Sequence, residues 1–88
     1  MPEYTFRMMG LPPKQGTRKI AIPPKATCAD AKKLVRQQYK ISDRLIIQLV
    51  FKGHPIRDVE VFAKFLQKMK YDPKKDTITV ISQQAGGS

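Results

Sequence analysis

Apolar and polar residues alternate along two short segments near the N-terminus. The apolar positions are Tyr4, Phe6 and Met8 in the first segment and Ile20 and Ile22 in the second. A period of two is typical of a β-strand with one buried face. The turn-rich residues 10–16 separate the segments, and Pro23 ends the second because proline cannot donate to a sheet ladder. We therefore predict a β-hairpin.

The spacing of apolar residues then changes to three and four positions, which is the spacing of one helix face. The positions that share it are Cys28, Ala31, Leu34, Val35 and Tyr39. Thr27 and Asp30 stand where a variant of the capping box begins a helix. Residues 60–69 repeat the helical spacing over a shorter length. The sequence thus predicts one main helix and a shorter second helix.

Three further segments favour strands. Residues 45–51 are rich in β-branched and large apolar side chains, and they end at a Gly-His-Pro turn. Residues 55–58 after this turn predict a short edge strand. Residues 77–81 alternate again and predict the final strand, with Ile78 and Val80 on one face.

The last seven residues, 82–88, contain no large apolar side chain that would hold them on the domain. We predict one domain over residues 1–81 and a flexible C-terminal tail over residues 82–88 that contains a diglycine. The predicted order is β-β-α-β-(β)-α-β, which is an α+β fold.

The chain is strongly basic, with 17 Lys and Arg against 7 Asp and Glu and a formal net charge of +10 among 88 residues. This balance points to acidic partners without identifying one. Charge alone admits nucleic acid, but the sequence has no concentrated basic block, base-stacking aromatic pattern or nucleic-acid-binding motif. We therefore do not expect a nucleic-acid partner.

Cys28 and His54 are the only residues of their kinds. A single cysteine forms no intramolecular disulfide, and one cysteine with one histidine is too few ligands for a typical metal site. We expect Cys28 to be a buried small apolar residue, and we expect no enzymatic activity because no acid, base and nucleophile set converges. No segment has the length of a membrane span or the order of a signal peptide, so we expect a cytoplasmic protein.

The order of hairpin, capped helix, strand ending in a Phe-x-Gly turn, final strand and Gly-Gly tail resembles the ubiquitin family over residues 4–87. The most similar stretch is residues 48–58, QLVFKGHPIRD, and the helix start from Thr27 is also similar. The resemblance implies a ubiquitin-like β-grasp fold, with a mixed sheet of four to five strands packed on one main helix. The shorter second helix over residues 60–69 and the long loop of residues 10–16 depart from the family, so the chain resembles a divergent member.

The resemblance also implies a mechanism. In this family an activating enzyme uses ATP to adenylate the terminal glycine carboxylate, here Gly87 beside Gly86. The carboxyl group then passes to cysteine thioesters and, with a ligase, to lysines of target proteins. Ser88 follows Gly87, so a deubiquitinase-type protease would first remove it. The chain itself would act as a monomer and bind no cofactor.

Further residues take roles from the resemblance. Val50 and Ile81 fall where the family exposes an apolar patch, which Leu11 would complete, unless the second helix covers them and makes them core. Gln83 and Ala85 replace arginines that ubiquitin's activating enzyme reads, which implies a dedicated activating enzyme. His54 replaces a chain-forming lysine, and Lys52 is a candidate acceptor in its place.

Three other functions stay open from the sequence. A sulfur-carrier protein shares the fold and diglycine but normally ends at the second glycine. A ubiquitin-like interaction domain would function without conjugation through Gly87. A basic nucleic-acid-binding module would show affinity that depends steeply on salt.

Overall fold

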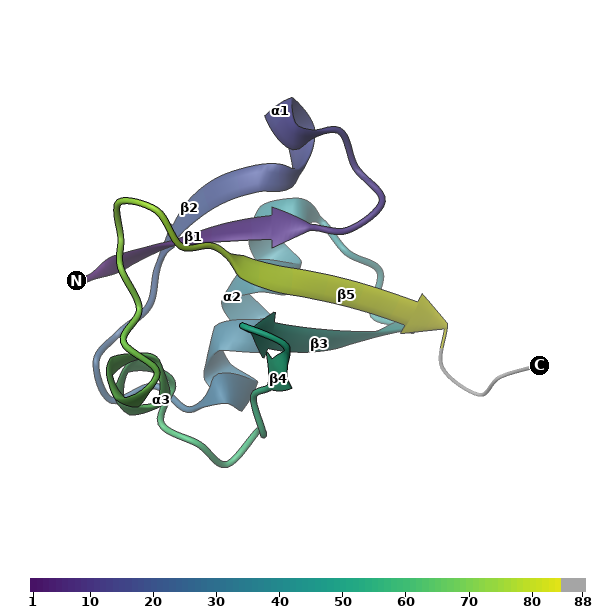
Figure 1. The fold of residues 1–88 in the computed structure, drawn as a ribbon. Helices are drawn as coiled ribbons and strands as arrows, with labels where there is room; N and C mark the ends of the chain where they lie inside the picture. The colour runs from purple at the N-terminus through teal and green to yellow at the C-terminus, as the bar shows by residue number, and fades with distance from the viewer. Residues whose placement is uncertain (85–88) are drawn as a thin grey trace.

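Five strands form one mixed sheet in the order β2-β1-β5-β3-β4 (Figure 1). The computed structural model describes residues 1–84, which form an α+β fold with three helices. The elements are β1 Glu3–Met8, α1 Pro13–Gly16, β2 Thr17–Ala21, α2 Cys28–Tyr39, β3 Leu45–Phe51, β4 His54–Pro55, α3 Phe62–Lys68 and β5 Ile78–Gln84. In Figure 1, α2 lies behind the sheet and the N-terminus is at the opposite end from the last residue of β5.

The central pair of the sheet joins the first and last strands. β1 and β5 are parallel, with Phe6 opposite Ile78, whereas the other neighbouring strands are antiparallel. Leu49 of β3 lies opposite Val80 of β5. Because side chains alternate along each strand, this register places all four of these side chains on the helix-covered side, where none is measurably exposed.

The core is filled between this side of the sheet and the helices. Phe6 stacks on Phe62 of α3 with ring centroids 5.9 Å apart, and Tyr4 meets the edge of Phe62 at 5.2 Å. Ala31 and Val35 of α2 are fully buried against the sheet. Both apolar helix faces predicted from the sequence therefore pack on one core.

The predicted capping box of α2 is confirmed. The backbone N–H of Asp30 donates to Thr27 Oγ1 at 3.3 Å, and the Thr27 backbone N–H donates to the Asp30 carboxylate at 3.1 Å. The helix ends at Lys40, whose φ of 53° is left-handed and whose N–H bonds back to Arg36 and Gln37. These contacts satisfy polar groups at both helix ends.

Three elements differ from the sequence prediction. The loop of residues 10–16 contains the one-turn helix α1. β4 spans only His54 and Pro55, although the N–H of the buried Ile56 still donates to Leu49 O of β3 at 2.8 Å. β5 continues to Gln84, although the sequence placed residues 82–84 in a flexible tail, because these residues pair with the first residues of β3.

Candidate functional site

The side of β3 and β5 that faces away from α2 is covered by no helix of residues 1–84 (Figure 1). The register of β3 with β5 shows which residues lie opposite one another on this side. Val50 lies opposite Thr79, Gln48 opposite Ile81, and Ile46 opposite Gln83. Neither β3 nor β5 contains a charged residue. An uncharged surface therefore runs across both strands.

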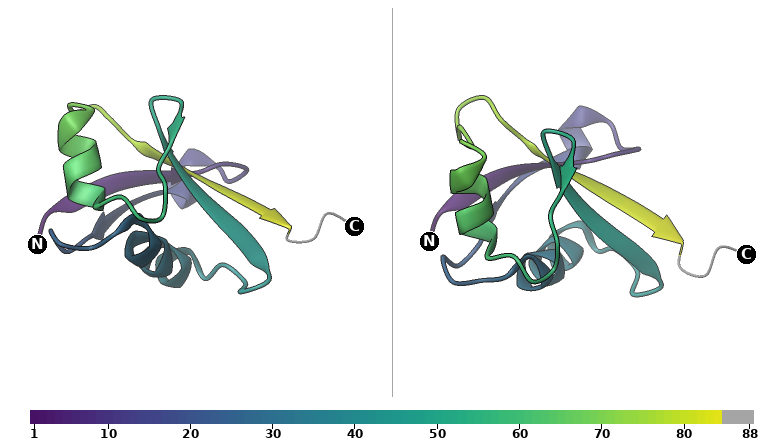
Figure 2. Two further views of the ribbon diagram at one scale, coloured as in Figure 1. Left: turned by 90° about the horizontal axis from the view of Figure 1, so that it is seen from below. Right: turned by 60° about the horizontal axis from the view of Figure 1, so that its bottom comes forward.

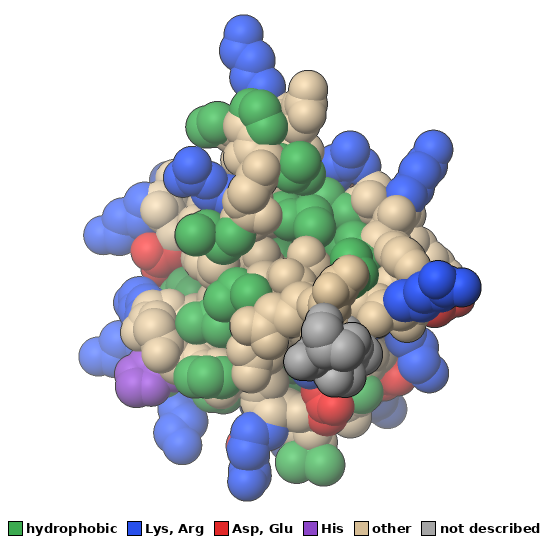
Figure 3. Space-filling view, turned by 90° about the vertical axis from the view of Figure 1, so that its right-hand side faces the viewer, with side chains coloured by type: hydrophobic (Ala, Val, Ile, Leu, Met, Phe, Trp, Pro, Cys, Tyr) green, Lys and Arg blue, Asp and Glu red, His purple; other side chains and the backbone are tan. Residues whose placement is uncertain are grey.

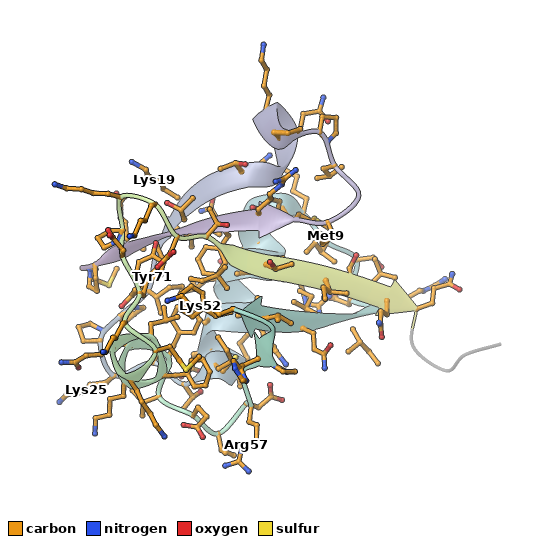
Figure 4. The ribbon with its side chains drawn as sticks, viewed as in Figure 1. Met9, Lys19, Lys25, Lys52, Arg57 and Tyr71 are labelled. Atoms are coloured by element: carbon orange, nitrogen blue, oxygen red, sulfur yellow. The ribbon has the colours of Figure 1, made fainter. Side chains whose placement is uncertain are left out.

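Apolar side chains extend this surface beyond β3 and β5. Met9 follows the last residue of β1, and its backbone N–H donates to Val80 O at 3.0 Å, which places Met9 beside the outward strand position of Ile81 (Figure 4). Met9 is 61% exposed, Ile46 54% and Leu11 38%. We name the set Met9, Ile46, Val50 and Ile81 the outer apolar face. Leu11, which was predicted to complete the patch, is exposed in the loop between β1 and α1.

The structure places Val50 and Ile81 on this face, half-buried and outside the core cluster. Figure 3, which looks onto the end of the molecule where β5 ends, shows several groups of apolar side chains among uncharged atoms, with Lys and Arg mainly around the outside. Arg7 supplies one such cation, since it lies opposite Thr79 in the strand ladder. Large apolar side chains exposed together on a basic protein are typical of a protein-binding surface.

Met9 and Ile46 were not predicted as site residues. Ile46 stands between Leu45 and Ile47 in a continuous apolar run. Strict alternation would have identified it as an apolar residue at an outward position. Met9 carries a weaker signal, because only the pairing of β1 with β5 shows that its neighbour is Ile81.

Gln83 and Lys52 lie at the margins of the outer apolar face. Gln83 is exposed at the end of β5, opposite Ile46. The Lys52 amine lies 3.3 Å from Met69 O and 4.0 Å from the Asp76 carboxylate, so it is directed toward the end of α3 (Figure 4). With a side chain 47% exposed, it remains accessible to solvent. The remaining predicted site residues, Ala85, Gly86, Gly87 and Ser88, lie outside the described residues.

Neither protein-family models nor curated proteins give any match to this sequence. Within residues 1–84, the helices are all too short or too polar to cross a membrane. The same residues contain no group of three or more His, Cys, Asp or Glu side chains arranged to hold a metal ion.

Cys28 is fully buried in the core, and its Sγ lies 3.5 Å from Ile56 O as a hydrogen-bond donor. Burial raises the pKa of this thiol to about 11, an effect that Lys32 opposes and Asp58 reinforces. A thiol with a raised pKa forms little of the thiolate that acts as a nucleophile. Cys28 is therefore a packing residue, as the sequence indicated.

The raised pKa of Cys28 gives a pH dependence of stability. A thiol in an unfolded chain ionises near a pH of about 8.5, whereas the folded state keeps Cys28 protonated up to about 11. The contribution of Cys28 to the free energy of unfolding is complete below about pH 8.5 and is lost as the pH rises from there to about 11. Urea denaturation across this range should show a steeper loss of stability in the wild type than in Cys28→Ala. Equal slopes would contradict the assignment.

Proposed function

We propose that this chain is a ubiquitin-like protein modifier, processed after Gly87 and joined through the Gly87 carboxylate to lysine amines of target proteins. The observation that carries this proposal is the outer apolar face on β3 and β5, because β5 leads directly into Gly86 and Gly87. The outer apolar face thus includes a residue, Ile81, of the strand that precedes the proposed reactive end in the sequence.

The proposal includes a β-grasp fold. It is supported by the order of the elements, by the parallel pairing of the first and last strands at the centre of the sheet, and by α2 packed across one side. The shorter helix α3 is an addition to the main helix rather than a second layer, because Phe62 and Leu66 pack into the same core as α2.

The short segment between β5 and Gly87 limits how far the proposed reactive carboxylate can lie from the outer apolar face. Only two residues stand between Gln84, the last residue of β5, and Gly87. Three residue steps span at most about 10 Å. An enzyme that holds Gly87 in its active site therefore lies within reach of the end of β5, where Gln83 and Ile46 are exposed.

The chemistry requires no catalytic group from this chain. A protease hydrolyses the bond between Gly87 and Ser88, and the freed carboxylate attacks ATP with release of pyrophosphate. An enzyme thiolate displaces AMP to form a thioester, and a lysine amine of the target then displaces the thiolate. Glycines suit such a tail because their backbone, without a Cβ, can pass through a narrow channel. We place this chemistry in the cytoplasm, where thiols stay reduced.

Intact mass spectrometry tests the proposal. The protein and its Gly87→Ala and Ser88→Ala variants are incubated with ATP and a lysate of the cells from which the chain derives. We expect loss of the residue after Gly87 and formation of isopeptide adducts for the wild type and for Ser88→Ala. We expect Gly87→Ala to form neither product, because its Cβ obstructs the enzyme channel.

Each other outcome points to a different function. A mass gain that matches a thiocarboxylate would overturn the proposal in favour of a sulfur carrier. Unchanged masses in a lysate that conjugates a known modifier would overturn it in favour of an interaction domain that is never conjugated.

A further inference from the structure

Helix α3 carries two apolar stripes with different surroundings. Phe62 and Leu66, four residues apart, are buried in the core with exposed fractions of 0% and 1%. Phe65 and Met69, also four residues apart, are only half-buried at the core margin. The second stripe therefore lacks a full partner within residues 1–84.

A groove lies beside this second stripe, between α3 and β4, with a volume of about 240 Å³. Figure 2 shows β4 and α3 facing one another, joined by the loop of residues 56–61. The apolar part of the groove lining consists of Pro55, Phe65 and Met69. β4 borders the groove with only two residues, and Phe65 and Met69 of the second stripe stay half-buried there.

The size of the groove indicates its occupant. Small-molecule sites usually enclose roughly 300–1,000 Å³ and bury most of their ligand, so this open groove is small for a metabolite. It suits a single apolar side chain of a partner protein.

The charges around the groove are unequal. Arg57 lines it, but its guanidinium lies 3.4 Å from the Glu60 carboxylate, so these two charges compensate (Figure 4). Lys68 also lines the groove and forms no ion pair with the described carboxylates. Lys64 is one helical turn earlier, four residues before Lys68, and is likewise exposed without an ion pair in residues 1–84. An excess of positive charge thus borders an apolar groove.

We propose that the groove between β4 and α3 is a second binding site, which takes an apolar side chain from an acidic segment of a partner protein. Carboxylates that flank this side chain would meet Lys64 and Lys68. This inference goes beyond conjugation, because no residue of the groove belongs to the C-terminal end. Since Pro55 lies opposite Val50 in the ladder, the groove also adjoins the outer apolar face, and one partner can occupy both.

Two synthetic peptides of equal length test the proposal in an NMR titration of the full chain. One has aspartates and glutamates around a central leucine, and the other has serine in place of that leucine. We expect the leucine peptide to bind with a Kd below about 1 mM. Its signals should change chiefly at His54, Phe65 and Met69, and the serine peptide should bind at least about tenfold more weakly.

Two charge-reversal variants serve as a matched pair. Lys68→Glu should weaken binding of the leucine peptide by about tenfold, because it places a negative charge at the groove. Lys19→Glu makes the same change in net charge on β2 and should leave binding nearly unchanged. Equal binding of both peptides, or equal loss in both variants, would show non-specific attraction of polyanions and overturn the proposal. Absence of binding at millimolar peptide would overturn it as well.

Neither titration depends on Gly87. A protein that forms no adducts but binds the leucine peptide in the groove would contradict the proposed function alone. A protein that forms adducts but shows no binding in the groove would contradict this inference alone.

Discussion

Replacement of Leu49 by alanine is expected to lower the free energy of unfolding by about 2–5 kcal/mol. Leu49 is fully buried at the centre of β3, opposite Val80. The substitution removes apolar contacts and leaves a cavity. Because β3 is paired with β5 on one edge and β4 on the other, the surrounding residues can fill this cavity only in part. A small domain has a total stability on the order of 5 kcal/mol, so much of the variant would be unfolded. Urea denaturation followed by circular dichroism measures the change.

Ile46→Ala is the matched control, because Ile46 lies on the same strand but points to the other side of the sheet. Its side chain is 54% exposed, so we expect a change in unfolding free energy of only about 0.5 kcal/mol. A loss at Ile46 as large as the loss at Leu49 would show that the outer apolar face is covered in solution, contrary to the structure.

The second large effect is on conjugation rather than on stability, and it concerns Ile46. Ile46→Asp is expected to reduce the formation of Gly87-linked adducts by about tenfold or more while the domain stays folded. The carboxylate would stand in the outer apolar face opposite Gln83, and binding of an apolar partner surface would leave this charge desolvated and unpaired. The rate of adduct formation in the ATP-containing lysate measures the effect.

Val59→Asp provides the control for this prediction. Val59 is even more exposed than Ile46, at 75%, and it lies in the loop before α3 rather than on the outer apolar face. The same change in size and charge there should leave the adduct rate within about twofold of the wild type. If Ile46→Asp also forms adducts at the wild-type rate, the outer apolar face has no part in recognition by the conjugating enzymes.

Helices α2 and α3 were the elements best predicted from the sequence, because their signals are local, whereas the one-turn helix α1 was missed. The Thr27 and Asp30 pair and the three- and four-residue spacing after it give the start and buried face of α2 directly. The spacing from Phe62 to Met69 likewise predicted α3. Capping and helical periodicity depend on residues within one or two turns, so no tertiary information is needed.

The ends of the strands were predicted less well. Residues 82–84 have no large apolar side chain, yet they extend β5 because backbone groups of β3 are available to pair with them. The predicted edge strand over residues 55–58 was too long, because β4 is only His54–Pro55 and Ile56 adds just one further backbone hydrogen bond to β3. A sheet ladder is made by main-chain groups, so its length depends on the partner strand rather than on the side chains of one strand.

The candidate site was also predicted only in part from the sequence. Alternation within single strands identified Val50 and Ile81 as outward residues, and the basic composition indicated acidic partners. Met9 joins these residues only through the parallel pairing of β1 with β5.

The sequence by itself determined helices α2 and α3, their buried faces, the alternation within each strand and the diglycine near the C-terminus. Each of these features depends only on residues that are close together along the chain. Tertiary structure alone decided that Met9, Ile46, Val50 and Ile81 form one face. It also decided that Phe65 and Met69 line the groove between β4 and α3. The physical reason is that pairing and packing between segments distant along the chain set which side chains share a surface.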